Sequence, residues 1–429
     1  MKIFLYDEFS PQDIAMMQAL YSRSPLSVET HIKKVKESGS GKFMERFYVG
    51  YGHASIADCG STTLFIEGVS MLAAKAIEDW PLFSGQESSS RYIDYGSQPI
   101  VDPVGSKQSA LVLNNWLEFY KKSQAKVEEH LMGKYPKKEG EDEVMYGKAI
   151  KARAFDILRG FLPAGVSTQL SWHTNLRQAY DKISSLKHHP LVEVRELANS
   201  IHNKLREKYP QSFGHIEPEE KENYREFLGD KYTYFFEDYK KDFSAKTTIK
   251  ESDLNKFKDV TNKRPERIGF PQFLAELGSV NFNFLLDFGS FRDIQRHRNG
   301  VCRMPLLTSK LGFNEWYLDQ LPSDIQKEAK VLLKEQIKAI KELKVEKEVA
   351  QYYLAMGFNV SCKVTYGLPA AAYVIELRSG RTVHPTLRIV AHKMHKAMLK
   401  LFPKLKLHSD LSLDDWDVRR GLHDIKQVK

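Results

Sequence analysis

The sequence predicts an α+β protein in which one domain occurs twice in tandem. Pairs of dipeptides that end in proline indicate the repeat: His189-Pro190 and His384-Pro385 are 195 residues apart, and Tyr209-Pro210 and Phe402-Pro403 are 193 residues apart. The order of features around these pairs also repeats, with an apolar helix, a loop, a long helix and a last helix in each half. Residues 168–177 are expected to form a strand or an extended segment that leads into a helix.

The bulk composition is that of a globular protein of more than one domain. The chain has 429 residues, of which 42% are apolar and 28% are charged. No apolar run approaches the ~18 residues needed to span a bilayer. The first ten residues carry acids where a signal peptide would have an apolar stretch, so we expect a cytoplasmic protein. Cys59, Cys302 and Cys362 are too few and too scattered for a disulfide framework or a zinc site, and we predict no metal.

The net charge of +9 and the pI near 9.0 indicate an anionic partner. The basic residues are spread through lysine-rich helices instead of being gathered with aromatic residues in one block. A solvated surface explains most of them, and the pattern does not favour nucleic acid.

Residues 1–44 are expected to form a helical arm, and the first copy of the domain is expected at residues 45–210. Within that copy, Leu64–Ile77 is predicted to be an apolar helix because Phe65, Val69 and Leu72 recur at helical spacing. A long helix is predicted at residues 107–134.

The loop 84–92 contains three successive serines, Ser88, Ser89 and Ser90, followed by Arg91. Hydroxyl groups, backbone N–H groups and a guanidinium fork together suit a phosphate. A flexible serine-rich loop is the alternative interpretation.

Residues 211–264 are expected to be a charged connector, and residues 265–429 the second copy. There Phe282–Ile294 is predicted to be an apolar helix that ends in the basic stretch Arg292–Gly300. Guanidinium groups at a helix end suit a phosphate-bearing ligand, although a basic rim on a buried helix would give the same pattern. A lysine-rich helix at Ala329–Val345 and a last helix after His384 follow.

Together these motifs resemble the flavin-dependent thymidylate synthases. The first copy has Gly52-His53, then Ser84, Glu87, Ser89 and Arg91 in register, then Arg159–Pro163 and Asn175–Arg177. The second copy has Arg292, Arg296-His297-Arg298, and Leu377-Arg378 before His384. Each copy lacks what the other has: Asp79-Trp80-Pro81 replaces Arg-His-Arg in the first, and Val301, Arg303, Met304, Leu306 and Thr308 replace the phosphate loop in the second.

The resemblance implies a mixed sheet flanked by long helices and one composite site per pair of copies. The first copy would give the nucleotide-phosphate half and the second copy the flavin half, so residues 87–91 and 292–300 are expected to lie side by side. Arg378, Ser89 and His53 are the implied catalytic residues. The implied substrate-binding residues are Glu87, Ser88, Ser89, Ser90, Arg91, Arg159, Gln295 and Arg378, and the implied cofactor-binding residues are Arg292, Arg296, His297, Arg298 and His53.

The implied activity is the FAD-dependent reductive methylation of dUMP to dTMP with methylene-tetrahydrofolate and NADPH, in a homodimer that mimics the homotetramer of the family. Two alternatives remain open. One is a homologue that binds flavin and a pyrimidine nucleotide but uses another substrate or one-carbon donor. The other is a non-catalytic nucleic-acid-binding protein.

Overall fold

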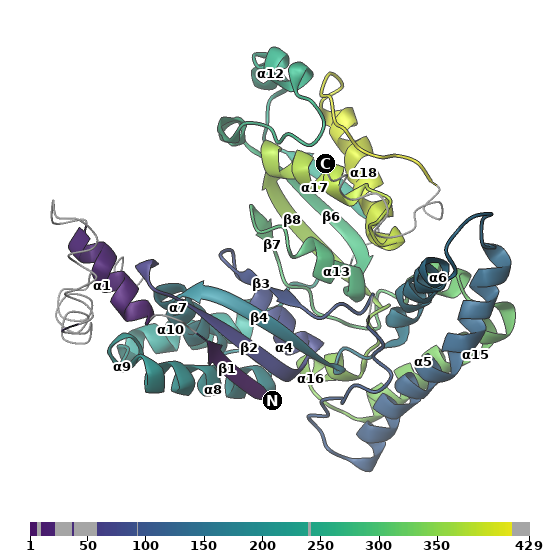
Figure 1. Cartoon of the computed structure of the whole chain (residues 1–429), viewed down its shortest axis with the longest axis horizontal. Coiled ribbons are helices and arrows are strands. Elements are labelled where there is room, and N and C mark those ends of the chain that lie inside the picture. The colour runs from purple at the N-terminus through teal and green to yellow at the C-terminus, as the bar shows by residue number, and fades with distance from the viewer. Residues whose placement is uncertain (7–9, 22–36, 38–57, 92, 239–241, 414–429) are drawn as a thin grey trace. The chain divides into compact units, whose positions relative to one another are not determined.

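The computed structural model describes residues 1–6, 10–21, 37, 58–91, 93–238 and 242–413 (Figure 1). These residues form two compact units, and each draws on separate stretches of the chain. The first unit consists of residues 1–88 and 166–233. The second consists of residues 89–165 and 234–429, so the loop that follows residue 88 belongs to it. The copy boundaries expected from the sequence remain a prediction.

The first unit is built on a four-stranded antiparallel sheet in the order β1 (Lys2–Tyr6), β2 (Ser61–Ser70), β4 (Ser167–Asn175) and β3 (Ser84–Glu87). Helix α4 (Met71–Glu78) follows β2 directly, and α7 (Leu176–Leu186) and α8 (Val192–Lys208) also pack against this sheet. Helices α1 (Pro11–Tyr21), α9 (Pro210–Phe213) and α10 (Glu219–Tyr232) complete the unit.

The helix predicted at Leu64–Ile77 is wrong over its first part, which is strand β2. Leu64 and Ile66 are buried whereas Phe65 between them is 43% exposed. This alternation is the period of a strand with one buried face. The helix begins only after Ser70, whose side chain accepts a hydrogen bond from the backbone N–H of Ala73.

The second unit has a sheet with the same order, β5 (Phe243–Thr247), β6 (Ser279–Asp287), β8 (Asn359–Gly367) and β7 (Val301–Cys302). Strand β5 lies within the stretch expected to be a connector. The helix predicted at Phe282–Ile294 is again a strand first, because buried side chains alternate along β6. Only α13 (Phe288–Ile294) is helical. Every neighbouring strand pair among the described residues is antiparallel, so the implied mixed sheet is wrong.

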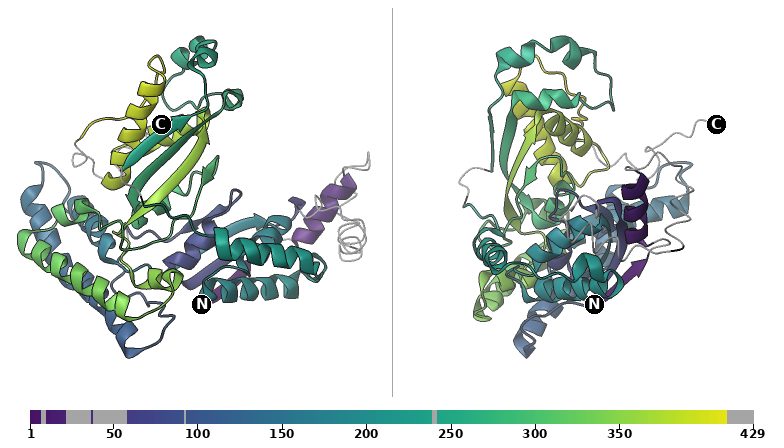
Figure 2. Two further views of the ribbon diagram at one scale, coloured as in Figure 1. Left: turned by 180° about the vertical axis from the view of Figure 1, so that it is seen from behind. Right: turned by 90° about the vertical axis from the view of Figure 1, so that its left-hand side faces the viewer.

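Helices α17 (Leu368–Arg378) and α18 (Pro385–Leu401) pack against the second sheet, as the yellow-green and yellow ribbons show (Figure 2). The stretch before β6 also contains α11 (Glu251–Asn255), α12 (Lys258–Lys263) and the 3-10 helix η4 (Gln272–Leu277).

Long helices form the rest of the second unit. Helix α5 (Lys107–Lys134) has the predicted bounds, and it contacts α15 (Ser323–Glu342), where Gln336 donates a hydrogen bond to the carbonyl of Val112 at 2.6 Å. Helix α6 (Glu143–Leu158) runs into η3 (Arg159–Phe161), and α16 (Lys347–Ala350) runs into η5 (Gln351–Tyr353). The short α14 (Glu315–Asp319) precedes α15. No helix in the described parts of the chain is long and apolar enough to cross a membrane.

The segments after η3 and η5 pair with each other symmetrically. The Gly165 N–H donates to the Tyr352 carbonyl at 2.9 Å, and the Gly357 N–H donates to the Gly160 carbonyl at 2.7 Å. Donor and acceptor positions in these two bonds both differ by 192 residues. When each of two segments donates an equivalent hydrogen bond to the other, the contact between them has approximate two-fold symmetry. Side chains would block the approach, since a Cβ on Gly165 would lie 2.8 Å from the Tyr352 carbonyl oxygen and one on Gly357 would lie 2.7 Å from the Gly160 carbonyl oxygen.

Candidate functional site

The serine loop and the basic stretch that follows β6 meet in the second unit. Arg292, on α13, donates a hydrogen bond from Nη1 to the hydroxyl of Ser90 at 3.2 Å, and both side chains are buried. The two residues are 202 positions apart in the sequence. The structure thus brings Ser90 and Arg292 together, one residue from each of the two stretches that were expected to lie side by side.

Arg91 is held on the opposite side of the loop by a carboxylate. Its Nε and Nη2 atoms donate to the two carboxylate oxygens of Asp156 at 2.7 and 3.1 Å. Nη2 also donates to the carbonyl of Thr382 at 3.2 Å, and the Arg91 backbone N–H donates to the hydroxyl of Ser89 at 3.3 Å. Because Asp156 is fully buried on α6, this fork fixes the direction of the guanidinium group.

Arg159 lies buried below the loop, at the start of η3. Its Nη2 atom donates to the hydroxyl of Ser290 at 2.7 Å. Asp287, the N-cap of α13, accepts hydrogen bonds from the Ser290 N–H at 2.8 Å and from the Tyr317 hydroxyl at 2.7 Å. Burial alone would lower the pKa of Arg159, but Tyr317 and Asp287 outweigh burial and raise it. Arg159 is therefore a fixed positive charge.

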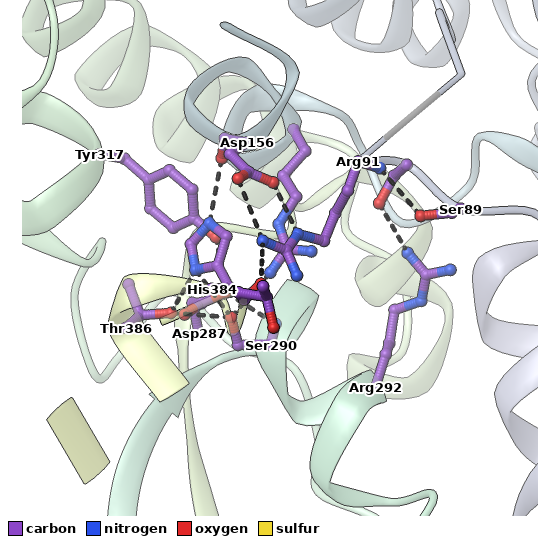
Figure 3. A network of polar contacts seen from close by, with 12 residues as sticks. Ser89, Arg91, Asp156, Asp287, Ser290, Arg292, Tyr317, His384 and Thr386 are labelled. Atoms are coloured by element: carbon purple, nitrogen blue, oxygen red, sulfur yellow. Dashed lines mark hydrogen bonds and ion pairs between the residues drawn. The ribbon is translucent and has the colours of Figure 1, made fainter. Parts of the chain in front are cut away.

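His384 links α6 to the N-terminus of α18. Its Nε2 atom lies 3.1 Å from the Asp156 carbonyl, to which it donates, so Nδ1 is an acceptor for the hydroxyls of Ser290 and Thr386 at 3.2 and 2.9 Å (Figure 3). Burial, with Arg159 and Arg91 nearby, lowers the pKa of His384 well below its ordinary value. This histidine is neutral and serves to hold the elements together.

Arg378 ties the end of α17 to the basic stretch. Its Nε atom donates to Nε2 of His297 at 2.7 Å, and its Nη2 atom donates to the carbonyl of Asp293 at 2.7 Å. His297 must therefore carry its proton on Nδ1. Burial, and then the charge of Arg378, lower the pKa of His297 to about 3. It is a neutral hydrogen-bonding group at physiological pH.

The pKa of Asp293 shows that the site has a positive electrostatic potential. Burial raises its pKa, but Arg159, Arg91, Arg378 and Arg296 together lower it to about 2. With Arg292, five arginines are gathered near three carboxyl groups, those of Asp156, Asp287 and Asp293. These arginines exceed these carboxylates by two positive charges, which suits a dianion such as a phosphate monoester.

The remaining predicted residues of the basic stretch lie nearby. Gln295 is buried, with its amide nitrogen 3.7 Å from the sulfur of Met304. Arg296 is exposed, and Arg298 donates to its carbonyl at 3.2 Å.

Glu87 and Ser88 belong to the first unit, where Glu87 is buried and forms an ion pair with Lys75 at 2.8 Å. Lys75 is also paired with Glu78. The structure does not place Glu87 or Ser88 relative to the arginines of the second unit, and His53 lies outside the described residues.

The Lys75 ion pairs occupy the counterpart of the arginine site in the first sheet. The N-caps Ser70 and Asp287 are 217 residues apart, and so are the first residues of β3 and β7. The same offset relates Lys75, Glu78 and Glu87 to Arg292, Gln295 and Met304. Equivalent positions thus carry an internal ion-pair cluster in one sheet and part of an arginine cluster in the other.

A cavity of about 900 Å³ adjoins the arginine cluster within the second unit. Residues 264–270, α17 and its following turn, and residues 407–410 line it. Tyr373 is one of the lining residues, and its ring packs edge-on against the ring of His297 with the centroids 5.9 Å apart. The cavity and the basic stretch therefore share a wall.

The fold and the site define an α+β protein with an arginine-rich anion site assembled from distant stretches of the chain. Residues 5–211 match the family model described as thymidylate synthase complementing protein. A UPF0159 protein of Chlamydia pneumoniae is 24% identical over 449 residues, covering 90% of this chain and 83% of that protein. A UPF0159 protein of Thermoplasma acidophilum is 23% identical over 468 residues, covering 90% and 93%.

Two solved structures are also similar to part of the chain. The flavin-dependent thymidylate synthase ThyX of Helicobacter pylori, complexed with FAD and dUMP, has a TM-score of 0.31 and 16% identity, covering 50% of this chain and 98% of that one. The UMP/dUMP methylase PolB of Streptomyces cacaoi, bound with 5-Br UMP, has a TM-score of 0.32 and 14% identity, covering 50% and 92%.

Asp156, Ser290 and Tyr317 were not singled out from the sequence, and His384 and Asp293 lay within its motifs without being given a role. Of the first three only Asp156 left a local signal, since it stands three positions before Arg159 and so on the same side of a helix. The side-chain hydrogen-bond partners of the others lie 30 or more residues away along the chain, apart from the Thr386 contact of His384 and the Ser290–Asp287 cap.

Proposed function

We propose that this protein is a flavin-dependent thymidylate synthase-like enzyme of the cytoplasm, which methylates dUMP to dTMP with methylene-tetrahydrofolate and NADPH. The observation that carries the proposal is the contact between Ser90 and Arg292 inside a cluster with excess positive charge. The match of residues 5–211 to the thymidylate synthase complementing protein model supports it.

In this proposal the nucleotide phosphate binds at the serine loop. Ser89 and Ser90 offer hydroxyls, and Arg91 and Arg292 offer guanidinium donors, within one network. Arg159 contributes its charge from below, because its side chain is buried and directed to Ser290. Arg378, which is anchored by His297, faces the pyrimidine ring.

The residues present also fit a flavin. A cavity of about 900 Å³ is of the size that ligand sites usually have, and it meets the basic stretch at Tyr373 and His297. Arg292, Arg296, His297 and Arg298 would hold FAD, together with His53. The flavin supplies the hydride, while the protein binds and orients the reactants.

A neutral histidine in the site limits the part that the protein itself can take in proton transfer. His297 is held neutral and accepts a hydrogen bond from Arg378, so it orients that arginine instead of donating a proton from Nε2. The positive charges are permanent because they belong to arginines. The protein's part in the reaction is therefore electrostatic positioning of anions.

We infer further that the chain is a tandem duplication with one site per chain. The identical strand orders, the constant offsets of 217 and 192 residues and the symmetric pairing of residues 160–165 with 352–357 all support a duplication. The second site is lost, since Lys75 and Glu78 stand where the second copy has Arg292 and Gln295, and Lys75 is held in ion pairs with Glu78 and Glu87. A homodimer of such chains would mimic a tetramer.

The test is to purify the protein, record the absorbance near ~450 nm that an oxidised flavin gives, and assay dTMP formation from dUMP, methylene-tetrahydrofolate and NADPH. Flavin binding together with dTMP is the expected result. Flavin binding without dTMP would contradict the proposed reaction and favour another substrate or one-carbon donor. A colourless protein that binds neither FAD nor dUMP would overturn the proposal as a whole.

A further inference from the structure

The segments that form the walls of the cavity beside α17 are joined by hydrogen bonds. Arg264 donates to Glu376 at 3.0 Å and to the Ile268 carbonyl at 2.7 Å, and its guanidinium lies over the Phe270 ring at 4.2 Å from the centroid. The backbone N–H of His408 donates to Glu376 at 2.8 Å. These bonds join residues 264–270, α17 and residues 407–410, so the cavity is held open by the fold.

One wall of this cavity is an exposed aromatic surface. Most of α17 is buried, yet Tyr373 is 55% exposed and Leu377, one turn later, is 46% exposed. Both residues line the cavity. A tyrosine and a leucine side by side on a helix offer a flat apolar surface, which is the kind of wall on which a planar ring stacks.

Tyr373 lies between this apolar surface and the basic stretch Arg292–Gly300, because its ring contacts His297. Its ring meets the His297 ring edge-on at an interplanar angle of 71°. His297 is in turn fixed by Arg378. A planar ligand on Tyr373 would therefore lie beside the groups that bind anions, and a molecule with both a ring system and phosphates fits the two surfaces at once.

We infer that Tyr373 is a stacking platform for the ring system of a flavin bound in this cavity. The inference rests on the proposed function, because it takes the ligand from there. The lining residues carry three carboxyl groups, Glu266, Glu376 and Asp410, and three arginines, Arg264, Arg267 and Arg381. Glu376 is paired with Arg264 and Asp410 with Arg381, so the wall has no excess negative charge to oppose an anionic cofactor. The walls thus combine an apolar ring surface with neutralised polar groups, as ligand pockets usually do.

The test titrates FAD into flavin-free protein and follows both binding and flavin fluorescence. Tyr373→Ala should weaken FAD binding by roughly tenfold, a loss at the upper end of what an aromatic pair contributes. Tyr373→Phe should keep the affinity but raise the fluorescence of bound FAD, because a phenol in contact with a flavin quenches it by electron transfer. Tyr232→Ala, which alters an exposed tyrosine of the first unit, is the matched control and should change neither quantity.

Circular dichroism of each variant checks that it is folded. If FAD binds but both Tyr373 variants keep the affinity and fluorescence of the unmodified protein, the inference is overturned and the proposed function stands. If the variants instead raise the KM for methylene-tetrahydrofolate or NADPH alone, the cavity belongs to that substrate and the inference is again wrong. If the unmodified protein binds no FAD, both the inference about Tyr373 and the proposed function are overturned.

Discussion

Arg91 and Asp156 form a two-point ion pair in the second unit, with N–O distances of 2.7 and 3.1 Å. The carboxylate is fully buried and the arginine side chain is 14% exposed, so the pair is little screened by solvent. Its geometry explains how an arginine in a serine-rich loop acquires one orientation.

Asp156→Asn should therefore weaken nucleotide binding and also destabilise the protein. The amide offers Arg91 one acceptor in place of two charged ones, and breaking a buried ion pair costs about 3–5 kcal/mol. We expect the Kd for dUMP, measured by calorimetry, to rise at least about tenfold. Asp324→Asn, in an exposed ion pair with Lys126, is the control, and an equal effect of both changes would contradict the role given to Asp156.

The proposed site uses residues from the serine loop and from the basic stretch, which meet at the Ser90–Arg292 contact. Both residues of this contact belong to the second unit of one chain. Arg91→Ala and Arg292→Ala should each lower dTMP formation by roughly 100-fold or more, as the loss of a charged anion-binding group does. Mixing the two inactive variants should not restore activity, because each chain would still have one damaged site. Recovery of activity on mixing would instead indicate sites shared between chains.

Lys75 offers a test of the first unit. The Lys75→Met change should destabilise folding by about 3–5 kcal/mol, since it leaves Glu78 and Glu87 buried without their cation. Urea denaturation measures this quantity. Lys122→Met, which removes an exposed pair with Glu328, should cost less than about 1 kcal/mol. An equal loss of stability in both variants would contradict a buried ion-pair cluster around Lys75.

The sequence predicted the long helices well and the strand–helix junctions poorly. Helix α5 has a polar face and clear caps, so its bounds could be read directly. In β2, by contrast, Leu64 and Ile66 are followed within a few residues by the apolar helix α4, and the combined run imitates helical spacing. Within this one apolar run the spacing of buried residues changes from every second residue, as in a strand, to every 3.6 residues, as in a helix. Such a change is hard to detect without knowing the neighbouring strand.

The candidate site could be predicted where chemistry is local. Ser89, Ser90 and Arg91 are adjacent, and Arg292 and His297 belong to one stretch, so their residue types alone suggested an anion site. The proximity of Ser90 and Arg292, which are 202 residues apart, was predicted from the complementary loss of motifs in the two halves and not from periodicity. The positioning roles of Asp156 and His384 depend on tertiary contacts, Asp156 with Arg91 and His384 with the Asp156 carbonyl, between residues far apart in the chain.

His297 should make stability depend on pH. Its pKa in the folded protein is about 3, below the ~6.5 of an unfolded chain, so the unfolded state binds more protons below pH ~6.5. The stability contributed by neutral His297 is thus complete above that pH and is lost as the pH falls toward 3. Asp293, with a folded pKa of about 2, adds a similar loss only below about pH 4.

The free energy of unfolding should consequently fall between pH 7 and pH 5, with His297 contributing about 2 kcal/mol of the decrease. Urea titrations at several pH values measure the slope. In His297→Gln, which keeps an amide acceptor for Arg378 but cannot titrate in this range, the decrease should be smaller by about that amount. His173→Gln is the control, because His173 lies on the exposed face of β4 and bonds only to Thr63 among the contacts described. An unchanged slope in His297→Gln would show that His297 is not the buried neutral partner of Arg378 in solution.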